Sequence, residues 1–139
     1  MPKIAKFILP ALPPSLNSIY KINYISKQVY LDKSVKEFKS IVYPLIPQIK
    51  IPEGQALELK IRYYGMFLNK SDGKIKRKDG QNLDKVLYDI IFEKWGLDDS
   101  ITFKGSWEKI HYPEKDLTEI EVYTTSIKKG YKNANQTDD

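Results

Sequence analysis

The sequence of 139 residues contains no cysteine and a single histidine, His111. The first absence excludes disulfides, zinc–thiolate sites and thiol nucleophiles, and the second excludes a histidine-rich metal cluster within one chain. No apolar run approaches the roughly 20 residues that a membrane-spanning helix needs. The opening stretch MPKIAKFILP is too short and too interrupted for a signal peptide. We therefore expect a cytoplasmic protein with no membrane partner.

Arginine is also scarce, because Arg62 and Arg77 are the only two in a chain whose net charge is +5. A modest positive balance suits a polyanion partner, but it is also common on surfaces with no such role. Lysine favours contacts to backbone phosphates over base reading, since bidentate recognition of guanine is mainly the work of arginine. Charge alone therefore leaves a nucleic-acid partner open.

Alternating apolar and polar residues predict most of the strands. Strands are expected over 3–9 and 56–68, and a hairpin over 19–31. Two more strands, over 101–112 and 117–127, are expected to run antiparallel through the connection PEKD. A hydrophobic content of 41% and a charged content of 29% are ordinary for a globular domain.

Two helices are predicted from apolar residues at helical spacing. The first opens at a capping box formed by Ser34 and Glu37 and ends at Pro44 and Pro47. Its apolar positions are Val35, Phe38, Ile41 and Val42. The second helix ends at Gly96. Its apolar stripe consists of Leu83, Val86, Leu87, Ile90 and Ile91.

The order strand, hairpin, helix, strand, helix, strand, strand predicts an α/β (α+β) fold. We expect a single small domain over 1–126, with a mixed β-sheet and two main helices, followed by a polar, mobile tail over 127–139. Trp95 and Trp107 are expected in the core, and His111, for which no partner is evident, is interpreted as structural.

The second helix and its flanks carry acidic and basic residues at informative spacing. Gln81, Lys85 and Asp89 are spaced by four and share one side, and Asp79 precedes the helix, where backbone N–H groups favour an anion. If the strand after the acidic stretch LDD (97–99) lies beside the helix N-terminus, Asp79 and Asp99 could converge. Carboxylates without cysteine or histidine suit a hard cation such as Mg²⁺, and the lysine could hold a phosphate.

Two motifs resemble those of the RusA-type Holliday junction resolvases. That family carries Asp-x-Asp-Asn-Leu-x-Lys at the start of a helix, a further Asp along it and an Asp-Asp pair after it. The corresponding residues here are DGQNLDK (79–85), Asp89 and LDD (97–99). The family's Pro-Pro-Ser-x-Asn before an aromatic residue corresponds to PPSLNSIY (13–20). The order of the motifs matches across roughly residues 4–126.

The resemblance implies a homodimeric, Mg²⁺-dependent endonuclease, with Mn²⁺ as an alternative ion, that cuts four-way DNA junctions by paired symmetric nicks. It implies catalytic roles for Asp79, Lys85 and Asp99. The metal ligands would come from Asp79, Gln81, Asp98 and Asp99. Supporting roles would fall to Asn82, Asp84 and Asp89. The DNA contacts would come from Asn17, Lys74, Lys76, Arg77 and Lys78.

One position departs from the family pattern, because Gln81 stands where the family has a second metal-binding aspartate. A glutamine carbonyl can reach a cation but brings no charge, so the metal affinity should fall. Four interpretations stay open: a weaker active site, a site rebuilt around Asp84 or Asp98, a protein that binds junctions without cutting them, and an introduced inactivating substitution. A plain α/β interaction domain, in which the acidic residues are only caps and turns, is the further alternative.

Overall fold

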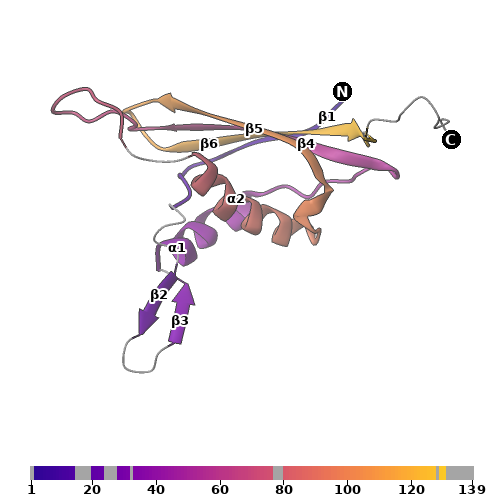
Figure 1. Ribbon diagram of the computed structural model, residues 1–139, viewed down its shortest axis with the longest axis horizontal. Helices are drawn as coiled ribbons and strands as arrows, with labels where there is room; N and C mark the ends of the chain where they lie inside the picture. The colour runs from indigo at the N-terminus through magenta and orange to yellow at the C-terminus, as the bar shows by residue number, and fades with distance from the viewer. Residues whose placement is uncertain are drawn as a thin grey trace.

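The computed structural model describes residues 2–14, 20–23, 28–31, 33–76, 80–127 and 129–130, with only the backbone for 20–23, 28–31 and 80–82. The predicted order of elements is confirmed (Figure 1). The strands are β1 (Lys3–Leu9), β2 (Tyr20–Asn23), β3 (Gln28–Leu31), β4 (Gln55–Gly65), β5 (Thr102–His111) and β6 (Leu117–Ser126). The helices are α1 (Lys33–Val42) and α2 (Gly80–Trp95), with short 3₁₀ turns η2 (Tyr43–Leu45) and η3 (Asp99–Ile101).

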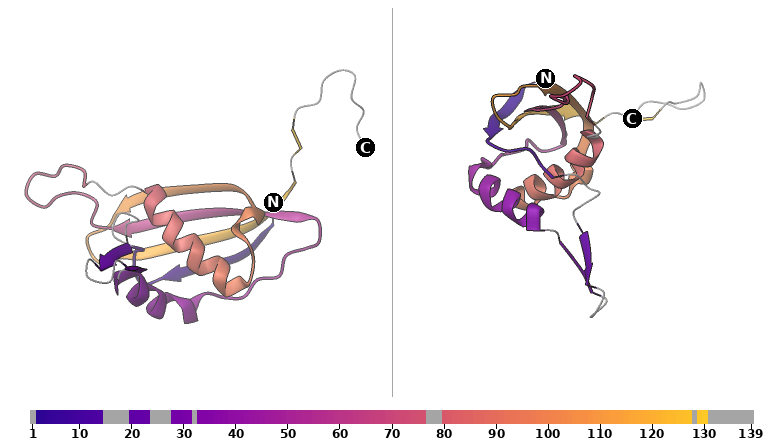
Figure 2. Two further views of the ribbon diagram at one scale, coloured as in Figure 1. Left: turned by 60° about the horizontal axis from the view of Figure 1, so that its bottom comes forward. Right: turned by 90° about the vertical axis from the view of Figure 1, so that its left-hand side faces the viewer.

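A four-stranded mixed sheet of order β1-β6-β4-β5 forms one layer, and both α-helices lie on one side of it (Figures 1 and 2). β1 and β6 pair antiparallel, as do β6 and β4, whereas β4 and β5 pair parallel. The β2–β3 hairpin, confirmed as predicted, projects away from the sheet and the helices (Figure 1). The fold is thus a small α+β domain with two main helices.

The last two strands run in opposite directions as expected, but they are not neighbours, because β4 lies between them. Their connection, residues 112–116, therefore crosses the end of β4, a span of roughly 10 Å for two strand spacings. The Tyr112 N–H donates to the Gly65 carbonyl at 2.7 Å on the way.

The core lies between the sheet and the helices, where the alternating apolar residues of β4 pack with the apolar stripe of α2. The alternating β4 residues are at most 1% exposed, and they are Leu57, Leu59, Ile61 and Tyr63. All five predicted stripe residues of α2 are buried as well. Gly96, at φ +67°, then ends the helix in the left-handed conformation that glycine adopts readily.

Four details of the sequence interpretation are wrong. The helix α1 begins at Lys33, so Ser34 lies inside it and not at its N-cap. Ile41 is half-exposed, because Val42 takes the inward position of that turn. Trp107 is 39% exposed, because β5 forms the edge of the sheet. His111 does have a partner, since its Nδ1 accepts the Phe67 N–H at 3.1 Å.

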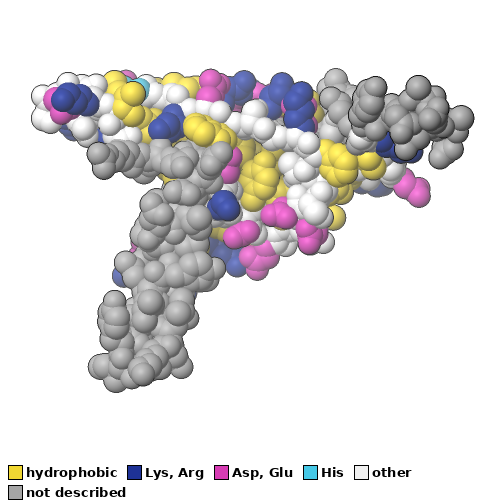
Figure 3. Space-filling view, in the orientation of Figure 1, with side chains coloured by type: hydrophobic (Ala, Val, Ile, Leu, Met, Phe, Trp, Pro, Cys, Tyr) yellow, Lys and Arg dark blue, Asp and Glu magenta, His cyan; other side chains and the backbone are white. Residues whose placement is uncertain are grey.

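Among the described residues, the sheet face opposite the helices carries ion pairs and no helix. The Arg62 guanidinium contacts Glu108 at 2.9 Å, Glu119 at 3.0 Å and Glu121 at 2.7 Å, and Lys3 reaches Glu121 at 3.2 Å. Lysine and arginine side chains (dark blue) accordingly line the upper side of the molecule in Figure 3. No helix in the described ranges is long and apolar enough to cross a membrane.

Candidate functional site

Asp84, one of the predicted supporting residues, faces the sheet. The hydroxyl of Tyr63, on the central strand β4, donates a hydrogen bond to its Oδ1. Tyr63 is fully buried. Burial, followed by the negative charge of Asp84, raises the pKa of this phenol above its ordinary value, so the hydroxyl stays protonated and continues to donate. Asp84 therefore anchors the start of α2 to β4.

Asp98 caps the short η3 turn that follows α2. Its carboxylate accepts the Ser100 N–H at 2.8 Å, and this hydrogen bond holds the pKa of Asp98 below its ordinary value. The approach to this turn is fixed by the C-terminal hydrogen bonds of α2, since the Leu97 N–H donates to the Phe92 carbonyl at 3.1 Å. One of the two predicted acidic residues of LDD thus has a structural role in its own turn.

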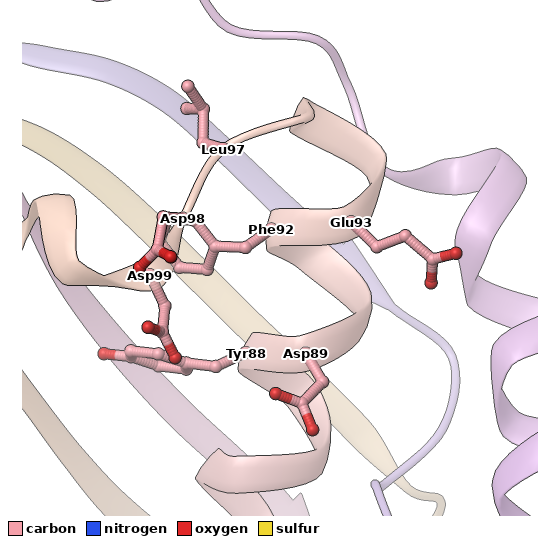
Figure 4. A pocket seen from close by; sticks show the side chains of 7 residues that line it. All are labelled: Tyr88, Asp89, Phe92, Glu93, Leu97, Asp98 and Asp99. Carbon is pink, nitrogen blue, oxygen red and sulfur yellow. The ribbon is translucent and has the colours of Figure 1, made fainter.

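Asp99 turns toward α2 and enters a cleft of about 300 Å³ between the helix and η3. The cleft is lined by Tyr88, Asp89, Phe92, Glu93, Leu97, Asp98 and Asp99. Figure 4 shows the Asp99 carboxylate beside the Tyr88 ring, with Asp89 on the helical wall next to it. Glu93 points away from them in the same view and pairs with Lys39 of α1 at 2.6 Å.

Asp99 is close enough for its charge to affect the ionisation of Asp89. Burial raises the pKa of Asp89, the charge of Asp99 raises it further, and Lys85 opposes the shift. The pKa of Tyr88 is also raised, to about 12, by burial and then by the charges of Asp84 and Asp99. Two carboxylates that repel each other across a polar cleft are stabilised by a cation.

The donor set of the cleft fits a hard ion. Mg²⁺ keeps several of its waters and is usually held by one or two carboxylates together with substrate phosphates. Asp89 and Asp99 supply that number. Among the residues that the structure describes, no group of three or more histidine, cysteine, aspartate or glutamate side chains lies close enough to form a complete metal shell.

The remaining predicted residues differ in how far the structure describes them. Lys85 is exposed on α2, and Lys74 is exposed on the loop before it, whereas Lys76 is half-buried. Only the backbone of Gln81 and Asn82 is described, in the first turn of α2. The residues outside the described ranges are Asn17, Arg77, Lys78 and Asp79.

The acidic stretch lies beside the middle of α2 and not beside its first turn. Asp99 lies next to Asp89, which is nine residues beyond Gly80, or roughly 13 Å along the helix axis. The expected convergence of Asp79 with Asp99 stays a prediction, because Asp79 is outside the described residues. Among the described residues, Asp89 is the acidic residue of α2 that shares the cleft with Asp99.

Two tyrosines of the site were not identified from the sequence. Tyr88 forms one wall of the cleft, and Tyr63 holds Asp84 from below. Tyr88 follows Asp84 by four residues, the spacing that places two side chains on one side of a helix, so its position was available in the sequence. Tyr63 gave no such signal, because its alternation with Ile61 indicates only a core strand.

Compared with models of known protein families and with curated proteins, the chain matches none of them. The resemblance to the RusA-type resolvases therefore depends on the quoted motifs and on the chemistry of the residues that carry them.

Proposed function

We propose that the protein is a divalent-cation-dependent, structure-selective DNA endonuclease that resolves four-way junctions by paired symmetric nicks. The observation that carries the proposal is the pair Asp89 and Asp99, which line one cleft, where the charge of Asp99 raises the pKa of Asp89. The motif order around α2 supports the choice of DNA junctions as the substrate. We also propose a cytoplasmic location and a homodimer with two equivalent sites, which suits the two equivalent strands of a junction.

Each residue of the site has a distinct task in this proposal. Asp89 and Asp99 hold the cation, and Asp79 and Gln81 join them as the resemblance implies. Mg²⁺, or Mn²⁺, would supply positive charge for the scissile phosphate and acidify a bound water. Lys85 offers its ammonium group to the phosphate, since it is exposed one helical turn from Asp89. Asp84 stays bound to Tyr63 and keeps α2 in place.

The lysine-bearing loop before α2 is assigned to the DNA backbone. Lys74 is exposed on this loop, and a β-bridge between Leu68 and Ile75 holds the two sides of the loop together. Lysines in such a loop attract phosphates and release counterions when DNA binds. Binding should therefore weaken steeply as the salt concentration rises.

A junction- or duplex-binding protein without nuclease activity is the second candidate. The observation that favours it is Gln81, which would remove one negative charge from the cation site and lower the affinity for a metal. Binding through the lysine loop would survive that loss.

The two candidates differ in one assay. The protein is incubated with an end-labelled four-way junction, or with a linear duplex of the same sequence, in Mg²⁺, in Mn²⁺ and in EDTA. Paired nicks in the junction alone, abolished by EDTA, are the result expected of the endonuclease. Tight, salt-sensitive binding of the junction without nicks would favour the binding protein. Neither binding nor nicking would overturn both and leave a plain interaction domain.

A further inference from the structure

The strand β5 is an open edge of the sheet. Within the described residues it is hydrogen-bonded on one side only, to β4. It is ten residues long and contains no proline, and its pairing with β4 is regular from Lys104 to His111. An edge of this length presents a row of unpaired backbone N–H and C=O groups that can pair with another strand.

Aromatic side chains of this strand are exposed. Trp107 lies beside Ile61 in the register, on the helix-facing side, and is 39% exposed, and Phe103, at the register shift near the start of the strand, is 52% exposed. Between them α2 comes close to the strand, since a Cβ built on Gly105 would lie 2.8 Å from the Tyr88 hydroxyl. Tyr88 of the helix therefore approaches β5 at Gly105, while Gly105 and Trp107 both keep exposed surface. Hydrophobic side chains (yellow) reach the surface between the sheet and the helices in Figure 3.

The opposite side of the strand carries one charge of each sign, placed symmetrically about Ser106. Lys104 and Glu108 lie two residues before and after it, and their side chains are 66% and 59% exposed. They share that face with the ion pairs of Arg62, because Arg62 lies beside Glu108 in the register. Lys104 also contacts Glu58 of its own chain at 3.7 Å. The two exposed charges are thus complementary to those of a second copy placed about Ser106.

We propose that β5 pairs antiparallel with β5 of a second copy of this chain, about a two-fold axis at Ser106. Lys104 then lies opposite the partner subunit's Glu108, and the reverse pair forms by symmetry. On the helix-facing side, Trp107 lies opposite the partner subunit's Gly105, so a large ring meets a residue without a side chain. Antiparallel neighbours directly opposite each other share a face, so both contacts form together.

Other two-fold registers are poorer. An axis at Lys104 or at Glu108 places like charges opposite each other, which is destabilising. An axis at Gly105 or at Trp107 leaves Lys104 opposite a serine or an isoleucine, so that Lys104 and Glu108 keep only their contacts within the chain, to Glu58 at 3.7 Å and to Arg62 at 2.9 Å. Of these five axes, only the one at Ser106 places the two opposite charges across the interface from each other. It joins the two four-stranded sheets into one continuous sheet with both α2 helices on the same side.

The inference depends on the β5 edge and not on nuclease activity, although it would give the proposed homodimer its interface. Because the chain has no cysteine, single cysteines report the register directly. In an antiparallel pair the opposed Cα atoms lie about 4.5–5.5 Å apart, which a disulfide can bridge. Three variants at positions on β5 are needed: S106C, K104C and E108C.

The expected pattern follows from the axis. Under mild oxidation S106C forms a disulfide with its own copy, whereas K104C alone and E108C alone do not, because their identical positions are roughly 14 Å apart. An equimolar mixture of K104C and E108C does cross-link. Circular dichroism of each variant confirms that the fold is retained. Sedimentation equilibrium of the unmodified protein should give a dimer.

Two results would overturn the inference. One is a monomer in sedimentation at concentrations where S106C fails to cross-link. The other is cross-linking of K104C or E108C alone as readily as of S106C, which would mean random collision or another register. A monomer would also contradict the proposed homodimer, whereas the cation site and the nuclease activity are tested separately by the junction assay.

Discussion

Replacing Tyr63 by phenylalanine removes one buried hydroxyl and leaves the ring, so it tests whether Asp84 is an anchor of α2. The hydroxyl donates to a half-buried carboxylate, and a hydrogen bond to a charged group contributes about 1.5–3 kcal/mol. Since the ring volume is nearly unchanged, no cavity is added. Tyr63→Phe should therefore lower the free energy of unfolding by about 2 kcal/mol, or about 6–8 °C in Tm for a domain of this size.

The matched partner is Asp84→Asn, which keeps an acceptor oxygen but removes the charge. In that background Tyr63→Phe should cost only about 1 kcal/mol, because the remaining hydrogen bond is neutral. Urea unfolding of the four proteins at pH 7 gives the coupling. Tyr64→Phe is the control, since its hydroxyl reaches Glu119 only at 3.3 Å on the exposed face.

Two results would refute this reasoning. A cost below about 0.5 kcal/mol for Tyr63→Phe would mean that the hydroxyl and the carboxylate are not coupled. The same cost with and without the Asp84 charge would mean that the charge plays no part. Calorimetry adds a functional readout: Asp84→Asn should retain divalent-cation binding if Asp84 is an anchor, and should lose it if Asp84 is a ligand.

Three further predictions concern charge. Asp89 has a raised pKa, so the folded state holds its proton more tightly and stability falls as pH rises above 3.8. At pH 7 Asp89→Asn should therefore be more stable than the unmodified protein by a few tenths of a kcal/mol, after allowance for solvent screening. At pH 3 it should lose that advantage, and Tm measured for both proteins at the two pH values checks this. Hydrogen bonds from Tyr123 and then Arg62 hold the pKa of Glu121 at about 2, against 4.5 ordinarily. That stability is fully present above pH 4.5 and is lost toward pH 2, so Arg62→Met should cost about 2 kcal/mol in urea unfolding at pH 7 and less at pH 3. Gln81→Asp should tighten divalent-cation binding in calorimetry, and unchanged affinity would mean that the motif is misaligned at this position.

The periodic parts of the fold were predictable because burial on one face imposes a period. Alternation in β4 and the 3.6-residue stripe of α2 placed their buried residues correctly. Trp107 shows the limit: its strand was predicted, but whether a strand lies in the middle of a sheet or at its edge depends on which other strands pair with it. The insertion of β4 between the last two strands was hidden for the same reason, since strand order is not a local property of the chain.

The site was predictable in residue type but only partly in arrangement. The acidic residues around α2 were identified from spacing, and Asp99 does enter a cleft beside that helix. Its partner there is Asp89, in the middle of the helix, because the turn through Gly96 leads the chain back along α2 only as far as its third turn. The sequence also did not predict that Asp84 faces the sheet, because this depends on how α2 packs against Tyr63 of β4.

The central claim is tested most directly by cleavage of a labelled four-way junction by the unmodified protein and by Asp99→Asn in Mg²⁺. Glu114→Gln is the matched control, because it removes one negative charge from an exposed turn away from the cleft. The account predicts paired nicks by the unmodified protein and by the control, and none by Asp99→Asn, which still binds the junction in a gel-shift assay. Cutting by Asp99→Asn at the full rate would contradict it.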